Sequence, residues 1–326
     1  MGITLKKVKL GKTPNLITAF GGLGIFHNVI LCSYFYDDLK STCSYMQKRK
    51  RGYSPARKIL SHMELILSGG ESLSDISMLN NDLAYKKVTN TKSLPSHTTL
   101  DDFYNSINKR DYKNYEELNL KQAIEYYKKN KKEFVTIDID SSLSFTEKKT
   151  AKYSYEKKRG FNPMYVVDEK NKIILSAKFR NGNASPQKDI FELMIKVISK
   201  LKEVIPQMKI SVRIDSAGYQ LKIIKYLVEN LYNFVIKGDV KLSKSKEFEL
   251  IHQKKWKKIS DDEDICRVTT TINSGSMNFK EVDAIVKRKL IYSKEKGYLE
   301  DIYSYTYVVT NISKYEISEE QIFVTT

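Results

Sequence analysis

Two aspartates, Asp140 and Asp215, each stand at the end of a run of apolar, largely β-branched residues. In residues 134–140 the apolar side chains alternate with polar ones, which predicts a strand with one buried face. Residues 210–214 predict a second strand, which ends at Asp215. Carboxylate oxygens without His or Cys among them suit Mg²⁺ or Mn²⁺ better than zinc. Such ions can activate an attacking hydroxyl and stabilise the leaving oxygen of a phosphoryl transfer.

The elements between the two aspartates decide whether they meet. Residues 164–167 and 173–179 predict a hairpin, and Ser185-Pro186 predicts a helix start with Ser185 as the N-cap. A right-handed crossover through that helix would place Asp140 and Asp215 at the carboxyl ends of neighbouring parallel strands, where open α/β sheets bind ligands. Aspartates at strand ends also commonly cap turns, so this position alone leaves both roles open.

The rest of the chain divides by the type of its pattern. The predicted regions are a helical, DNA-binding region at 1–132, a core at 133–237, a lysine-rich and β-rich insertion at 238–303, and a last core strand with a short tail at 304–326. The expected fold class is therefore α/β, with a mixed sheet between a helical domain and an insertion.

The formal charge of +17 creates a positive field that attracts polyanions, and nucleic acid is the first such partner to consider. The candidate DNA contacts are Lys48, Arg49, Lys50, Arg51, Arg213, Lys254, Lys255, Trp256, Lys257 and Lys258. An aromatic ring among four lysines could stack on an unpaired base while the lysines hold phosphates. The alternatives stay open: a lysine-rich proteome, solvated basic faces, and a half-buried Trp256.

Cysteine usage and hydropathy indicate the compartment. The three cysteines are odd in number and lack paired metal-ligand spacing, which argues against a disulfide framework and a zinc ribbon. The uncharged stretch 16–36 is interrupted by glycines and polar residues, so it predicts buried helices and no membrane span. We expect a cytoplasmic, nucleoid-associated protein.

Two short segments carry a resemblance to a known family. Residues 140–145 (Asp-Ser-Ser-Leu-Ser-Phe) and 213–219 (Arg-Ile-Asp-Ser-Ala-Gly-Tyr) resemble the segments that hold the first and second catalytic aspartates of bacterial insertion-sequence DDE transposases. Segments similar to other family landmarks follow the family's order, at residues 70–75, 94–100, 180–183 and 309–311. The resemblance assigns catalysis and metal binding to Asp140 and Asp215, and Asp138, on the same strand face as Asp140, is a supporting metal candidate.

The same resemblance implies a ribonuclease-H-like core, Mg²⁺ or Mn²⁺ as cofactor, and double-stranded DNA with terminal inverted repeats as partner, bound by a homodimer. In the family a third carboxylate follows the insertion, in a Tyr-x2-Arg-x3-Glu-x6-Lys pattern. Counted from Tyr315, Ser318 and Ile322 stand where Arg and Glu are expected. The expectation is a truncated or degenerate copy that binds DNA and cuts it poorly. The alternatives are a non-catalytic inhibitor of transposition and a metal-dependent nuclease outside transposition.

Overall fold

The computed structural model describes residues 15–47, 51–274, 277–292 and 301–324. The chain forms two compact units, Met1–Leu118 and Asn119–Thr326, and the division falls inside helix α7 (Lys109–Lys129). The sequence prediction placed this boundary at 132. The difference arises because Leu120, Ile124 and Tyr127 of α7 are buried in the core of the second unit.

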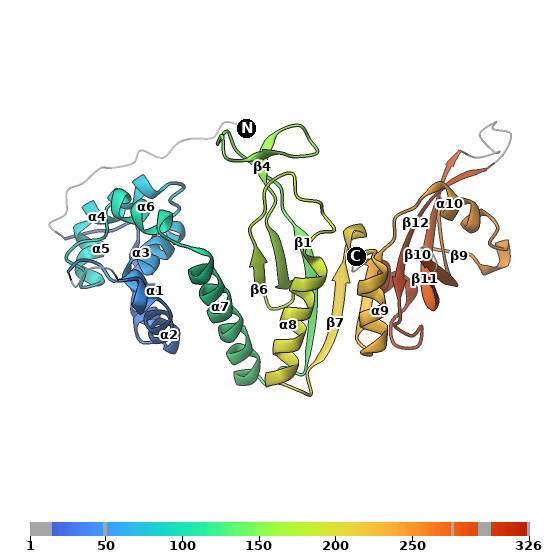
Figure 1. Ribbon diagram of the computed structural model, residues 1–326, viewed down its shortest axis with the longest axis horizontal. Helices are drawn as coiled ribbons and strands as arrows, with labels where there is room; N and C mark the ends of the chain where they lie inside the picture. Colours follow the sequence, from blue (N-terminus) through green and yellow to red (C-terminus); the bar gives the residue numbers. More distant parts are fainter. Residues whose placement is uncertain (1–14, 48–50, 275–276, 293–300, 325–326) are drawn as a thin grey trace, which may run out of the picture. The chain divides into compact units, whose positions relative to one another are not determined.

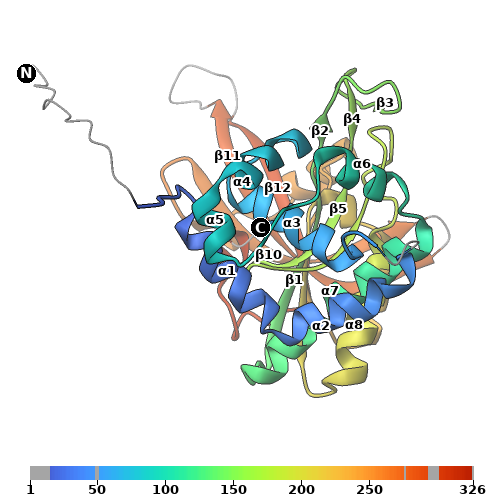
Figure 2. The ribbon, with the colours of Figure 1, turned by 90° about the vertical axis from the view of Figure 1, so that its left-hand side faces the viewer.

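The first unit is built from helices packed around α3 (Figure 2). Their bounds are α1 Gly21–Leu31, α2 Tyr34–Cys43, α3 Pro55–Leu67, α4 Ile76–Asn81, α5 Leu83–Val88 and α6 His97–Asn105, with 3-10 turns at Ser44–Met46 and Leu73–Asp75. The Ser54 side chain accepts a hydrogen bond from the backbone N–H of Arg57, and Pro55 takes the first helical position of α3. This combination is the usual N-terminal signal of a helix. In α1, the exposed Ile25 and Val29 depart from the buried helix predicted for this stretch.

The second unit contains one nine-stranded sheet in the order β6-β5-β1-β7-β8-β12-β11-β10-β9 (Figure 1). Its strands are β1 Phe134–Ser141, β5 Met164–Asp168, β6 Ile173–Lys178, β7 Lys209–Ile214, β8 Asn233–Lys237, β9 Lys257–Lys258, β10 Glu263–Ser274, β11 Met277–Tyr292 and β12 Ile302–Thr310. Strands β1, β7 and β8 are mutually parallel, whereas β5 and β6 run antiparallel. This mixed sheet of an antiparallel hairpin and parallel crossovers confirms the α/β, ribonuclease-H-like prediction.

The residues predicted as an insertion add strands to the same sheet, because β12 pairs with both β8 and β11. The β10–β11 hairpin is longer than its apolar pattern indicated. Charged residues extend it by pairing across the strands: Arg288 contacts Asp264 at 2.8 Å and is only 6% exposed at its side chain. Cross-strand ion pairs of this kind stabilise strands that do not read as apolar alternation.

Three helices of the second unit contribute to its core or border the site: α8 Ile190–Val204, α9 Leu221–Glu229 and α10 Leu242–Glu249, with a short α11 at Glu319–Val324. The predicted start of α8 at Ser185-Pro186 is wrong. Residues 185–189 form a turn, and the N-cap is Asp189, whose φ of 73° lies in the left-handed region and interrupts helical geometry. The guanidinium of Arg180 donates to the Ser185 and Lys188 carbonyls and so holds this turn.

A second, three-stranded sheet follows β1 and was not predicted. It has the order β2-β4-β3, with β2 Ser144–Phe145, β3 Lys152–Tyr153 and β4 Arg159–Phe161, and we call it the small sheet. It projects beyond the carboxyl end of β1 (Figures 1 and 2). Strands of two or three residues are too short to show an apolar period. Among the described residues, no helix has the length and apolar character needed to cross a membrane.

Candidate active site

The register of β1 and β7 brings the two predicted catalytic aspartates together. Asp138 is paired with Arg213 and Ile139 with Ile214, so Asp140 and Asp215, one residue further along each parallel strand, lie at neighbouring positions of the same edge. Asp215 also caps the turn that follows β7, because its Oδ1 accepts a hydrogen bond from the Ala217 N–H at 3.0 Å. The capping role and the site role therefore coexist in one side chain.

The electrostatic surroundings of Asp215 are unbalanced. Burial raises the pKa of its carboxyl group, the Ala217 amide opposes this, the neighbouring Asp140 adds to it, and Lys237 lowers it. Within the described residues, neither Asp140 nor Asp215 forms an ion pair with a side chain. Two adjacent carboxylates without an internal cation favour the binding of an external one.

A cavity of about 790 Å³ opens beside Asp215. Its walls come from the 185–187 turn, the turn after β7, α10 and Tyr307 of β12. Asp239, which follows the third parallel strand β8, lines this cavity and was missed by the sequence prediction, although strand β8 ends just before it. In the described part of the chain, no three His, Cys, Asp or Glu side chains lie close enough to hold one metal ion.

One arginine fixes the wall of this cavity. Arg180 is 5% exposed, and its Nε donates to the Asn162 carbonyl at 2.9 Å. Its Nη1 donates to the carbonyls of Ser185 and Lys188 at 3.2 and 2.8 Å. The segment 180–183, which the sequence marked only as a family landmark, thus positions the turn beside Asp215.

The model of the family described as transposase DDE domain group 1 matches residues 3–326. The chain belongs to this family of DNA phosphoryl-transfer proteins. No curated protein sequence matches it. Among solved structures it is similar to a piggyBac transposase synaptic complex with hairpin DNA, at 11% identity and a TM-score of 0.39, covering 91% of this chain and 63% of that one. It is also similar to a Mos1 transposase paired-end complex with the left transposon end, at 8% identity and a TM-score of 0.24, covering 58% and 61%.

The transposase chain thus spans less than two thirds of the length of these two neighbours. A third similar structure is a Mos1 mariner paired-end complex with Mn, at 10% identity and a TM-score of 0.23, covering 63% of this chain and 67% of that one.

Two of the residues predicted for this transposase site are engaged with each other. The guanidinium of Arg213 donates from Nε and Nη2 to the two oxygens of Asp138, with an Nη2–Oδ2 distance of 2.8 Å, and it also contacts Glu169. Burial raises the pKa of Asp138, and Arg213 opposes that shift. The metal role of Asp138 and the DNA role of Arg213 stay predictions, since the structure places both in an internal ion pair.

The first predicted basic run is only partly visible. Lys48, Arg49 and Lys50 lie outside the described residues. Arg51 is exposed and, together with Lys58, lines a cavity of about 550 Å³ within the first unit. A DNA contact by this run stays a prediction.

The second basic run surrounds a ring that is already covered. Trp256 is half-buried, and the Arg288 guanidinium lies 4.3 Å from the centroid of its ring. Lys257 and Lys258 pair with Glu320 and Asp261, while Lys254 and Lys255 are exposed beside the ring. This arrangement fits the alternative of a half-buried aromatic with solvated neighbours, and base stacking on Trp256 stays a prediction.

Proposed function

We propose that this transposase-family chain catalyses metal-dependent DNA strand cleavage and transfer, with Asp140 and Asp215 as its catalytic carboxylates. The observation that carries the proposal is the adjacency of the two side chains at the carboxyl ends of β1 and β7, without a cation from the described protein. An oxygen-only donor set suits Mg²⁺ or Mn²⁺. Such an ion, held by Asp140 and Asp215, would supply activation of the attacking hydroxyl and stabilisation of the leaving oxygen.

The chain's own groups orient this site. The Ala217 N–H holds one oxygen of Asp215, and the Ser141 N–H donates to Asp140 at 2.6 Å. Lys244 is fixed by Glu247 at 2.7 Å and by Thr270 at 2.8 Å, so it brings an ordered positive charge to the cavity. We infer that the scissile phosphodiester enters from this cavity, where positive charge offsets the repulsion between phosphate and carboxylates.

The partner in this proposal is double-stranded DNA with the terminal inverted repeats of the element, bound by two copies of the chain at the nucleoid in the cytoplasm. The net charge of +17 supports a nucleic-acid partner. The competing function is a DNA-binding protein that occupies element ends without cutting them. One observation favours it, namely that the described residues bring no third metal-binding side chain to the pair.

Cleavage of labelled DNA that carries the flanks of the encoding gene, in Mn²⁺, tests the proposal. Wild-type chain should cut, and Asp140→Asn or Asp215→Asn should lower the rate at least about a thousandfold, which is ~4 kcal/mol of transition-state stabilisation. Asp261→Asn, a fully exposed carboxylate of the same unit, should leave the rate unchanged. Binding without cutting by the wild-type chain would support the competing function instead.

A further inference from the structure

The small sheet gathers basic side chains next to the proposed site. We propose that it is a binding surface for the sugar-phosphate backbone of double-stranded DNA, which it holds beside Asp140 and Asp215. The proposal rests on the proposed function for the identity of the substrate. It adds a DNA contact at residues 144–161, a segment that neither predicted basic run includes.

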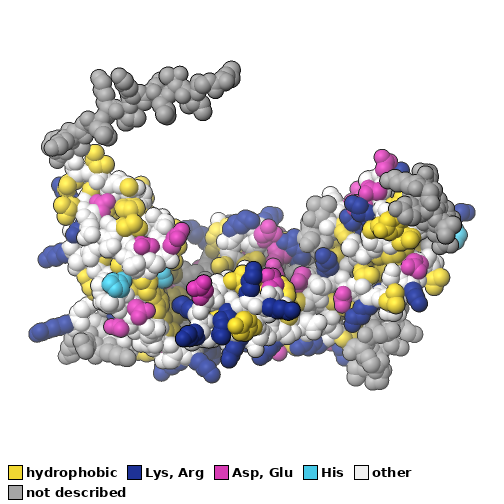
Figure 3. Space-filling model, turned by 90° about the horizontal axis from the view of Figure 1, so that it is seen from above, with side chains coloured by type: hydrophobic (Ala, Val, Ile, Leu, Met, Phe, Trp, Pro, Cys, Tyr) yellow, Lys and Arg dark blue, Asp and Glu magenta, His cyan; other side chains and the backbone are white. Residues whose placement is uncertain are grey.

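The charge of this segment is strongly positive and uncompensated. Residues 144–161 contain six basic and two acidic side chains. Its exposed lysines are Lys148, Lys149, Lys152, Lys157 and Lys158. Among the described residues none of these lysines forms an ion pair, in contrast to Lys257 and Lys258 of the second basic run. Seen from above, Lys and Arg side chains gather over the middle of the picture, where the small sheet lies (Figure 3).

Internal contacts order this surface. The Nη1 of Arg159 donates to the carbonyls of Lys149 and Ala151 at 3.0 and 3.1 Å, which ties the β2–β3 connection to β4. The same guanidinium lies 4.7 Å from the centroid of the Tyr153 ring. The lysines therefore extend from a fixed backbone, which lowers the entropy that binding must overcome.

Glycines fix the small sheet to the rest of the site. The Gly182 N–H donates to the Gly160 carbonyl at 2.9 Å, and a Cβ on Gly182 would lie 2.6 Å from that oxygen. A Cβ on Gly160 would lie 2.6 Å from the Ser144 carbonyl oxygen. The segment that contains Gly182 also contains Arg180, which holds the turn beside Asp215. One segment thus positions both the basic surface and the cavity.

The electrostatics of the site favour a phosphate backbone as the occupant. Asp140 and Asp215 are two uncompensated carboxylates, and they repel the polyanion that a DNA phosphoryl transfer must bring to them. The small sheet begins three residues after β1 ends and supplies positive charge where that repulsion acts. A backbone contact of this type gives affinity and position without sequence preference.

Salt-dependent binding tests the proposal. The triple variant Lys148→Gln, Lys149→Gln and Lys152→Gln removes three charges without removing a side-chain contact to any described residue. The control triple, Lys172→Gln, Lys200→Gln and Lys225→Gln, removes three exposed lysines paired with Glu169, Glu203 and Glu229. The full chain is titrated with a fluorescent duplex of mixed sequence, without metal, at several salt concentrations.

We expect the slope of log K against log salt to fall by about 0.9 for each lost phosphate contact, so by about 2.7 for the small-sheet triple, and to stay unchanged for the control. Equal slopes for the two triples would overturn the proposal. Acetylation of the wild-type chain gives a measurement free of variants: duplex DNA should protect Lys148, Lys149 and Lys152 more than Lys200, and equal protection would contradict the proposal.

The two proposals fail separately. A chain that binds DNA through the small sheet but never cuts in Mn²⁺ would refute the catalytic function and leave the binding surface in place. A chain that cuts, while its small-sheet triple binds as the wild type does, would refute only the surface.

Discussion

Two carboxylates that the fold withdraws from water, one in each unit, have opposite surroundings. Glu64 of α3 is fully buried and contacts His27 Nδ1 through one oxygen, with Arg57 at 3.6 Å from the other. Asp215 of the second unit has a backbone amide as its hydrogen-bond partner and the carboxylate of Asp140 as a neighbour. The first carboxylate is matched by the protein's own cationic and imidazole groups, whereas the second is not.

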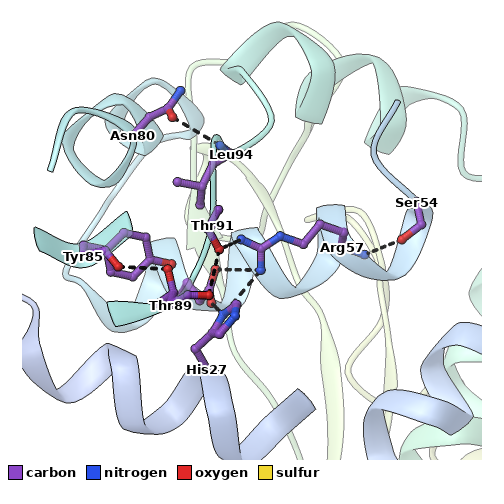
Figure 4. A network of polar contacts seen from close by, with 9 residues as sticks. His27, Ser54, Arg57, Asn80, Tyr85, Thr89, Thr91 and Leu94 are labelled. Carbon is purple, nitrogen blue, oxygen red and sulfur yellow. Dashed lines mark hydrogen bonds and ion pairs between the residues drawn. The ribbon is translucent and has the colours of Figure 1, made fainter. Parts of the chain in front are cut away.

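The network around Glu64 is closed on itself (Figure 4). Arg57 Nη2 donates to the Thr91 hydroxyl at 3.2 Å, and that hydroxyl donates to the Thr89 carbonyl at 3.3 Å. These contacts connect α3 to the segment between α5 and α6. A buried charge that is matched within the fold indicates a structural role, whereas a half-buried carboxylate without a matching charge indicates a place for an external cation.

Replacement of Glu64 should give the largest change in stability. Glu64→Ala leaves His27 and Arg57 without their buried partner, and we expect the free energy of unfolding of the first unit to fall by about 3 to 5 kcal/mol. Hydrogen exchange of the α3 amides in urea measures it, with the exposed Glu71→Ala as control. Asp215→Asn should cause no such loss, because it removes a charge that burial disfavours. A loss of similar size in both variants would contradict the comparison.

Addition of Mg²⁺ should give the next largest effect. If Asp140 and Asp215 bind the ion, the second unit should gain about 2.7 kcal/mol at a free metal concentration of about 100 times Kd. The fluorescence of Trp256, the single tryptophan of the chain, follows unfolding of this unit. The double variant Asp140→Asn and Asp215→Asn should show no gain, and Asp261→Asn should keep it. A gain that survives the double variant would place the ion elsewhere.

The smallest effect should come from a neutral group of the same network. Ser54→Ala removes the side-chain oxygen that accepts from Arg57 N at 3.2 Å and should cost about 1 kcal/mol, because a helix cap is worth about that much. Hydrogen exchange of the α3 amides again measures it, with the exposed Ser41→Ala as control. A cost equal to that of Glu64→Ala would mean that buried charge is not what distinguishes the network.

The sequence predicted the parts of the site that depend on neighbouring residues. Alternating apolar residues predicted β1, and the family segments marked Asp140 and Asp215. The parts that depend on tertiary contacts could not be predicted. The helix start at Ser185 failed because Arg180, five residues earlier, holds a turn there. The pairing of His27 with Glu64 joins residues 37 positions apart, which no local pattern reveals.

The pairing of β8 with β12 has a consequence for how the chain is made. The Thr310 hydroxyl donates to the Phe234 carbonyl at 2.6 Å, across 76 residues of sequence. At a synthesis rate of about 5 to 20 residues per second, β8 therefore waits on the order of 4 to 15 s for its neighbour to be translated. During that time it is an unpaired, apolar sheet edge, the kind of surface that recruits other chains. The growing polypeptide thus has an interval in which a holdase chaperone, or another copy on the same polysome, competes with β12 for that edge.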